Sequence, residues 1–120
     1  MKLLIAEDNE FNQMVLNDIL ELIYPDVEID IKDSAKDALD TIEDFDQYDL
    51  ILSDIDMPHM NGFEFYTQLR ENRNYTKPVI AVTALAIKGD EEKMLAHGFD
   101  AYISKPIDID VLQSAIGKFI

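Results

Sequence analysis

Apolar residues along the chain occur in two alternating kinds of segment. Short apolar runs are typical of strands, and longer stretches with apolar residues three or four positions apart are typical of helices. The pattern predicts strands at about residues 3–6, 27–31, 50–52, 79–82 and 101–104, each followed by a helix. Regular alternation of strands and helices predicts an α/β domain whose parallel sheet is covered by helices on both faces.

The predicted helices are bounded by residues that suit helix ends. Asn9, Ser34, Asn61 or Gly62, and Asp108 are placed to begin four of them, and Gly98 to end a weaker one that starts at about Ile87. We expect the apolar residues at helical spacing to face the sheet. In the first helix these are Phe11, Met14, Val15, Ile19, Leu22 and Ile23, and in the last Val111, Leu112, Ala115, Ile116 and Phe119.

The strands differ in a way that predicts their order. The first, third and fourth are continuously apolar, which is typical of central strands buried on both faces. In the second, Val27, Ile29 and Ile31 alternate with charged residues, which is typical of an edge. The prediction is a doubly wound, flavodoxin-like sheet in the order 2-1-3-4-5. A ligand site is then expected beyond the carboxyl ends of strands one and three, where the winding direction changes.

Polar residues follow the carboxyl ends of four predicted strands and should meet at this edge. They are Glu7, Asp8, Asp54, Asp56, Thr83 and Lys105. Neighbouring carboxylates repel one another, and a hard cation such as Mg²⁺, which prefers oxygen ligands, relieves that repulsion. One carboxylate can then act as a nucleophile toward a phosphoryl group, while the lysine and threonine contact its oxygens. The pattern predicts a magnesium-dependent phosphoryl site.

Four motifs closely resemble the receiver domain of response regulators in two-component signalling, and the resemblance covers the whole chain. The motifs are Ala6-Glu7-Asp8-Asn9, Ser53 to Pro58 with Asn61-Gly62, Val82-Thr83-Ala84, and Tyr102 to Pro106. The resemblance implies phosphorelay signalling: a histidine kinase or histidine phosphotransfer protein donates a phosphoryl group to the domain. The face formed by the fourth helix, the fifth strand and the last helix then controls binding of a downstream protein, and the domain is a monomer or a phosphorylation-dependent dimer. It implies no enzyme beyond self-phosphorylation and slow autodephosphorylation.

The same resemblance assigns roles to the residues. Asp54 is the phospho-acceptor, and Asp8 and Asp54 hold Mg²⁺, or Mn²⁺ in its place, with the Asp56 backbone carbonyl. Glu7 acts through a metal-bound water. Thr83 is the switch hydroxyl, Lys105 pairs with phosphate, Tyr102 is the switch aromatic, and the Lys105–Pro106 peptide bond is cis. The acidic pair is Glu-Asp rather than the commoner Asp-Asp.

Two side chains are expected to tune hydrolysis of the phosphoryl group. Asp56 and Leu85 should flank the line along which water attacks. Leu85 is apolar and cannot orient a water, whereas the Asp56 carboxylate can either hold water or repel the phosphoryl oxygens. We expect that obstruction of the attacking water by Leu85 dominates and lengthens the lifetime of the phosphorylated form.

Composition narrows the remaining choices. A chain of 120 residues fits one domain, and we expect a receiver domain over 1–120 without an output domain. Its net charge is −15, and −11 remains after the four site carboxylates are removed, so direct nucleic-acid binding is unfavourable. There is no cysteine, and the first apolar run is too short for a signal peptide or membrane span, which favours a cytoplasmic protein without a membrane partner.

Several alternatives remain open on sequence alone. Asp54-Ile55-Asp56 also matches the D-x-D of haloacid-dehalogenase-type phosphatases, although there the motif follows an early strand. It also begins like an EF-hand loop, but Pro58 and His59 occupy a ligand and a glycine position. A pseudo-receiver would usually lack a site residue, and none is lost here. The chain resembles both free-standing regulators and receivers of hybrid sensor kinases.

Overall fold

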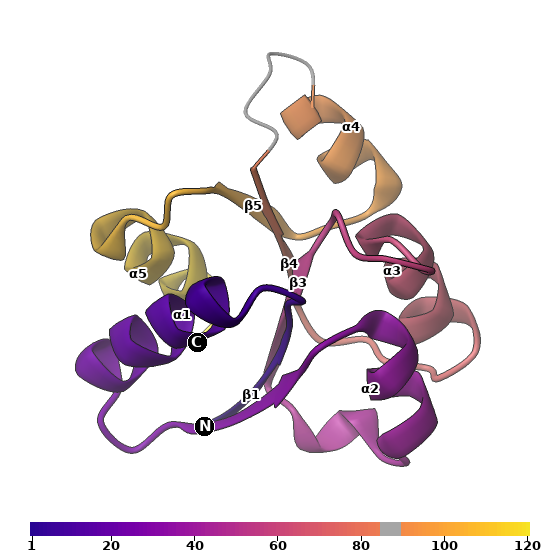
Figure 1. Ribbon diagram of the computed structural model, residues 1–120, viewed down its shortest axis with the longest axis horizontal. Coiled ribbons are helices and arrows are strands. Elements are labelled where there is room, and N and C mark those ends of the chain that lie inside the picture. The colour runs from indigo at the N-terminus through magenta and orange to yellow at the C-terminus, as the bar shows by residue number, and fades with distance from the viewer. Residues whose placement is uncertain (85–89) are drawn as a thin grey trace.

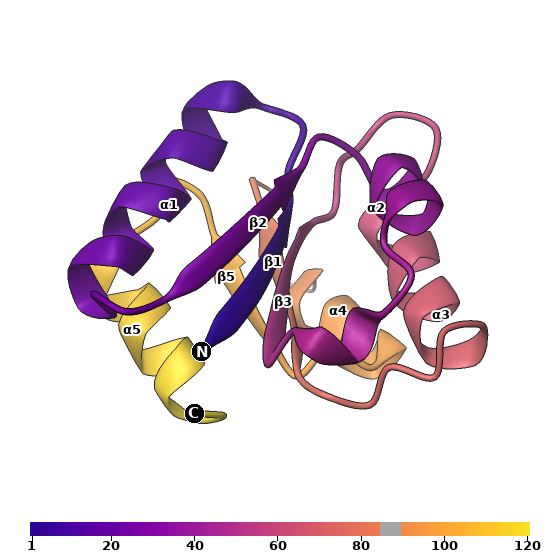
Figure 2. The ribbon, with the colours of Figure 1, turned by 90° about the horizontal axis from the view of Figure 1, so that it is seen from below.

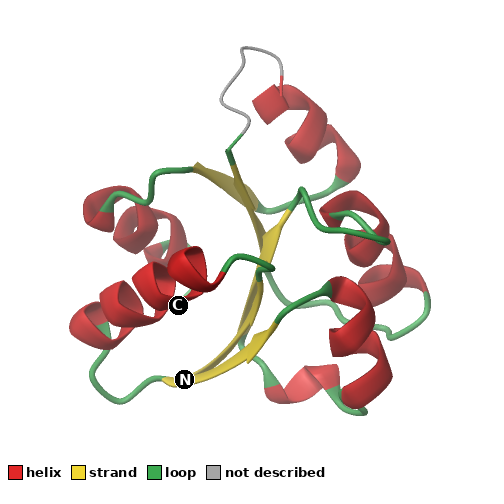
Figure 3. Cartoon of the chain, viewed as in Figure 1, coloured by secondary structure: helices red, strands yellow, loops and turns green. Residues whose placement is uncertain are grey.

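A computed structural model of the chain describes residues 1–84 and 90–120. A five-stranded parallel sheet forms the middle layer, and helices cover both of its faces (Figures 1 and 3). The strands are β1 (Lys2–Ala6), β2 (Glu28–Lys32), β3 (Leu50–Asp54), β4 (Val79–Thr83) and β5 (Ala101–Ser104). The helices are α1 (Glu10–Ile23), α2 (Ala35–Thr41), α3 (Gly62–Glu71), α4 (Asp90–His97) and α5 (Ile109–Gly117), with a 3₁₀ turn, η1, at Phe45–Gln47.

The strand order is β2-β1-β3-β4-β5, which confirms the predicted order. All residues of β3 and β4 are buried, whereas β2 lies at the edge and has no fully buried residue (Figure 2). The difference follows from position, because a central strand of a doubly wound sheet is covered on both faces. The direction of winding changes between β1 and β3, and the carboxyl ends of these strands mark the expected ligand site.

Two hydrophobic clusters fill the space between the sheet and its helices. One lies under α2, α3 and α4, and the other under α1 and α5 (Figure 2). From α1, Leu16 and Leu20 enter the core. Some residues of α1 and α5 that were predicted to face the sheet do not. Phe11 and Leu22 of α1 and Val111 of α5 are exposed, so the prediction was wrong for these positions. Met14 is also exposed.

Side chains at the predicted positions cap the helices. Asn9, Ser34, Asn61 and Asp108 each accept a hydrogen bond from a backbone N–H in the first turn. Asn61 and Glu64 form a complete capping box, which fixes the start of α3 beside the carboxyl end of β3. The predicted start of the fourth helix at Ile87 lies outside the described residues. Within the described residues, no helix has both the length and the hydrophobicity that a bilayer span requires.

Candidate functional site

The sheet register brings the polar ends of four strands to one edge. Asp54 is the last residue of β3 and pairs with Val82 of β4, and Thr83 pairs with Ser104 of β5. The next residue, Lys105, donates its backbone N–H to the Thr83 carbonyl at 2.8 Å. Because parallel strands end at the same edge, residues distant in sequence meet there, as the sequence predicted.

Three carboxylates form a compact cluster at this edge. Glu7, Asp8 and Asp54 each offer an oxygen, and these oxygens all lie within 4.8 Å of one another. Glu7 and Asp54 are buried, with 1% and 3% of their surface exposed, whereas Asp8 is exposed. The cluster is therefore open to solvent on one side, where an ion and a substrate can approach.

The ammonium of Lys105 lies between the two buried carboxylates. Lys105 Nζ is 3.0 Å from Glu7 Oε2 and 3.4 Å from Asp54 Oδ2. It donates a hydrogen bond to Glu7 Oε1 at 3.3 Å. One cation thus faces two buried anions, which leaves the buried part of the site with a negative charge. A positively charged ligand is the natural complement.

The electrostatics of Asp54 reflect this imbalance. Burial raises the pKa of the Asp54 carboxyl, and the neighbouring Glu7 carboxylate raises it further, while Lys105 opposes the change. Glu7 Oε2 is buried and accepts no hydrogen bond of good geometry from any residue that the structure describes, although Lys105 is close. A divalent cation whose bound water donates to this oxygen would satisfy it and favour the ionised form of Asp54. The donor set, which is all oxygen, fits Mg²⁺.

The first turn of α1 orients Glu7. The Asn9 backbone N–H donates to Glu7 Oε1 at 3.2 Å, and the Asn12 side-chain amide lies 3.5 Å from the same oxygen. Gln13 donates to the Glu7 carbonyl at 2.6 Å and to Asp33 at 2.8 Å. Asn12 and Gln13 were not among the site residues predicted from the sequence. The available signal was that amide side chains follow the acidic pair by one helical turn.

Gly62 allows α3 to approach Asp54 closely. A methyl group at this position would lie 2.4 Å from the Asp54 carbonyl oxygen and 2.8 Å from Ile55 Cα. The Gly62 N–H donates to the Ile55 carbonyl at 2.8 Å. These contacts fold the loop after β3 back on itself, beside the acidic cluster. Only a residue without a side chain fits at this position. From the sequence, Gly62 was predicted only as a possible start of the helix, and this steric requirement was not predicted.

The remaining residues predicted for the site differ in burial and in their distance from the acidic cluster. Asp56 donates its backbone N–H to Asp54 Oδ1 at 3.3 Å, but its carboxylate is exposed and lies outside the cluster. Thr83 is fully buried at the end of β4. Tyr102 is partly buried and donates its hydroxyl to Glu91 of α4 at 3.2 Å. Leu85 lies outside the described residues. The Lys105–Pro106 peptide bond is cis.

Known proteins are similar to this chain over most of its length. The family model for the response regulator receiver domain matches residues 3–117. The response regulator DivK of Brucella ovis is 39% identical over 119 residues, which cover 98% of this chain and 94% of DivK. Hybrid signal transduction histidine kinase I of Dictyostelium discoideum is also 39% identical, but the chain spans only 7% of it.

Solved structures agree with the sequence relatives. The receiver domain of a sensor histidine kinase from Pseudomonas aeruginosa is 28% identical, with a TM-score of 0.83 over 98% of this chain and 95% of that one. That crystal structure contains a magnesium ion coordinated in the active-site cleft. The chemotaxis response regulator CheY4 of Vibrio cholerae is 25% identical, with a TM-score of 0.80 over 99% of this chain and 98% of that one. The chain belongs to the response regulator receiver domain family, which acts in phosphorelay signalling.

Proposed function

We propose that this receiver domain, spanning residues 1–120, accepts a phosphoryl group on Asp54 from a histidine kinase or a histidine phosphotransfer protein. The observation that carries the proposal is the buried Asp54 carboxylate, which lies beside Glu7 and 3.4 Å from the Lys105 ammonium. A structural aspartate would need one such partner for stability. Two buried carboxylates that share one ammonium are instead suited to binding a further cation and a phosphoryl group.

The transfer itself is a substitution at phosphorus. An Asp54 carboxylate oxygen attacks, an oxygen–phosphorus bond forms, and the phosphorus–nitrogen bond of the phosphohistidine breaks with its electron pair leaving on the ring nitrogen. Lys105 pairs with one phosphoryl oxygen, and the Thr83 hydroxyl donates to another. The domain catalyses only this reaction and its own slow dephosphorylation.

The metal would be held by Asp8 and Asp54 side chains and the Asp56 backbone carbonyl, with Glu7 acting through a bound water. When bound, Mg²⁺ supplies positive charge that offsets the repulsion between the carboxylates and the phosphoryl oxygens. Mn²⁺ is expected to substitute, because it also prefers oxygen ligands.

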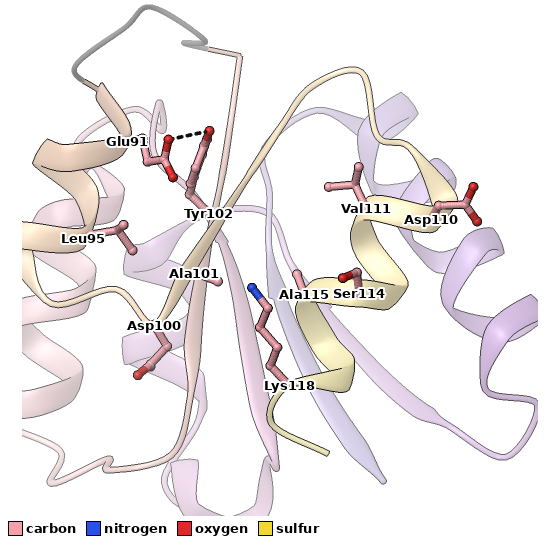
Figure 4. A pocket seen from close by; sticks show the side chains of 10 residues that line it. All are labelled: Glu91, Leu95, Asp100, Ala101, Tyr102, Asp110, Val111, Ser114, Ala115 and Lys118. Atoms are coloured by element: carbon pink, nitrogen blue, oxygen red, sulfur yellow. Dashed lines mark hydrogen bonds between the residues drawn. The ribbon is translucent and has the colours of Figure 1, made fainter.

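The output is a change in the face formed by α4, β5 and α5. Thr83 and Tyr102 are the coupling residues: the phosphoryl group draws the Thr83 hydroxyl toward it, and the Tyr102 ring fills the space vacated. A cleft of about 460 Å³ on this face is the expected contact site for a downstream protein (Figure 4). The domain is either a monomer throughout or forms a dimer when it is phosphorylated.

The test is phosphorylation by acetyl phosphate with Mg²⁺, followed by intact mass. Wild type should gain one phosphoryl group, and Asp54→Asn should gain none. The exposed Asp46 provides the matched control, since Asp46→Asn removes a carboxylate remote from the site and should label as wild type does. Labelling of Asp54→Asn at the wild-type rate, or undiminished labelling of wild type in excess EDTA, would contradict the proposal.

A further inference from the structure

Tyr102 is placed to connect the site with α4. In the β4–β5 register, Ala81 pairs with Tyr102 and Thr83 pairs with Ser104. Side chains alternate along a strand, so Thr83 and Tyr102 project from the same face of the sheet. At its other end, the Tyr102 hydroxyl donates to Glu91 Oε2 at 3.2 Å. A movement of Tyr102 toward Thr83 would therefore have to break its bond to α4.

The carboxyl end of α4 is fastened firmly to the rest of the domain. Met94 is 2% exposed, within the cluster that lies under α3. His97 Nε2 lies 3.0 Å from the Phe63 carbonyl oxygen, and the Tyr66 hydroxyl donates to the Gly98 carbonyl at 2.9 Å. The rings of His97 and Phe63 also meet edge to face at 5.0 Å. These contacts hold the last turn of α4 against α3.

Among the residues that the structure describes, fewer contacts hold the amino end of α4, where the Lys93 ammonium lies 5.8 Å from the centre of the Phe63 ring. Glu91, the second residue of the helix, is exposed. Among the side chains that the structure describes in this first turn, its hydrogen bond to Tyr102 is the link to the sheet. A helix end whose described link to the sheet is one exposed hydrogen bond is expected to move more easily than an end that is packed.

We propose that the Glu91 carboxylate is a latch, meaning that its hydrogen bond to the Tyr102 hydroxyl holds Tyr102 outward and so opposes activation in the unphosphorylated domain. The inference rests on the proposed function, because it assumes that phosphorylation draws Tyr102 inward. Glu91 is a positioning residue that contacts neither the phosphoryl group nor the metal ligands. The same hydrogen bond raises the pKa of the Tyr102 phenol, which agrees with a charged acceptor.

The latch also shapes the output face. Figure 4 shows Glu91 and Tyr102 joined at one end of the cleft, which lies between α4 and α5 over β5. Leu95 and Val111 line the cleft and are 44% and 49% exposed. When Tyr102 turns inward, the phenol leaves this end of the cleft and the Glu91 carboxylate is released. One movement thus changes both the shape and the available charge of the face that a partner meets.

The test measures the outward–inward equilibrium by NMR. Amide shifts of β4 and β5 are recorded for wild type and Glu91→Ala, without ligand and in a titration with beryllofluoride and Mg²⁺. Loss of this one exposed hydrogen bond should favour the inward state by roughly three- to tenfold. The shifts of unliganded Glu91→Ala should therefore move toward the beryllofluoride-bound positions, and beryllofluoride should bind more tightly by the same factor.

Two further variants separate the latch from other effects. Glu92→Ala removes the neighbouring exposed carboxylate, whose side chain makes no hydrogen bond to any residue that the structure describes, and should behave as wild type. In a Tyr102→Phe background the phenol donor is gone, so adding Glu91→Ala should have no further effect.

The outcomes that overturn the latch differ from those that overturn the proposed function. If Glu91→Ala matches Glu92→Ala in shifts and affinity, or acts undiminished in the Tyr102→Phe background, the latch is wrong while the proposed function stands. If wild type itself shows no response to beryllofluoride with Mg²⁺, the proposed function fails, and the latch fails with it.

Discussion

Replacing Asp54 by asparagine should stabilise the metal-free protein at neutral and alkaline pH. Burial and the Glu7 carboxylate raise the pKa of Asp54 to about 7 in the folded protein, from 3.8. Between these two values the folded protein holds a proton that the unfolded chain has released. The free energy of unfolding therefore falls as pH rises from about 4 to about 7, and it stays lowered above that range.

The magnitude follows from the size of that pKa difference. Each pKa unit corresponds to about 1.4 kcal/mol, so a difference of about three sets an upper bound of about 4 kcal/mol. The asparagine side chain cannot ionise and avoids this cost, and the opposing attraction of Lys105 is already contained in the pKa of Asp54. Because solvent reaches one side of the cluster and screens part of this effect, we expect Asp54→Asn to raise the free energy of unfolding by about 2–4 kcal/mol at about pH 8, and by less than half as much at about pH 5.

Urea unfolding followed by circular dichroism, with EDTA present, measures the effect. Asp46→Asn is the control for the loss of one exposed carboxylate and should change stability by less than about 0.5 kcal/mol at either pH. Adding Mg²⁺ at a hundredfold excess over its dissociation constant should stabilise wild type by about 2.7 kcal/mol, and Asp54→Asn by less. If Asp54→Asn is no more stable than wild type at about pH 8, or if its gain in the free energy of unfolding is the same at about pH 5, then the pKa of Asp54 is not raised as described.

Three further changes test other parts of the site. Lys105→Met leaves two buried carboxylates without their cation and should cost about 3 kcal/mol in metal-free urea unfolding above about pH 7; unchanged stability there would argue against the ion pair. Gly62→Ala places a methyl group 2.4 Å from the Asp54 carbonyl oxygen and should cost about 1–3 kcal/mol in thermal unfolding. Gly117→Ala, which meets nothing within 4 Å, should cost nothing; equal losses would contradict the steric argument. Leu85→Glu should shorten the lifetime of the phosphorylated form about tenfold, followed as adduct mass after the donor is removed, and an unchanged lifetime would exclude position 85 from control.

The strand order and the edge that carries the site could be predicted because they depend on burial. A strand covered on both faces needs apolar residues throughout, and β3 and β4 have them, whereas β2 alternates. Once the order is known, the winding change between β1 and β3 locates the ligand edge. The capping residues were also predictable, because an Asn, Ser or Asp side chain satisfies backbone N–H groups within its own turn.

The inward face of α1 could not be predicted from spacing alone. Apolar residues occur around most of this helix, so two different faces satisfy the helical period. The packed face contains Leu16 and Leu20, while Phe11 and Leu22 are 66% and 72% exposed. Which face turns inward depends on how the helix axis lies on the sheet, and that is set by contacts with β1 and α5 rather than by local sequence.

Residues that position others were missed for a related reason. Gln13 has a role because α1 turns it toward the Glu7 carbonyl and Asp33, and Glu91 because α4 lies beside β5. Neither residue type is unusual on the surface of a helix, so its sequence carries no sign of the contact. Gly62 is similar: the need for glycine arises only when α3 packs against the Asp54 backbone.

The instability of the metal-free site and its function have the same origin. Burying Glu7 and Asp54 around one ammonium leaves negative charge that the fold does not compensate. A bound cation relieves the repulsion between the two carboxylates. The repulsion that lowers the stability of the metal-free protein therefore increases the affinity for Mg²⁺. In the proposed reaction, a phosphoryl group on Asp54 would add negative charge again, at the carboxyl end of β3 and beside β4. The charge that makes the site unstable without metal is therefore the same charge through which phosphorylation can change the domain.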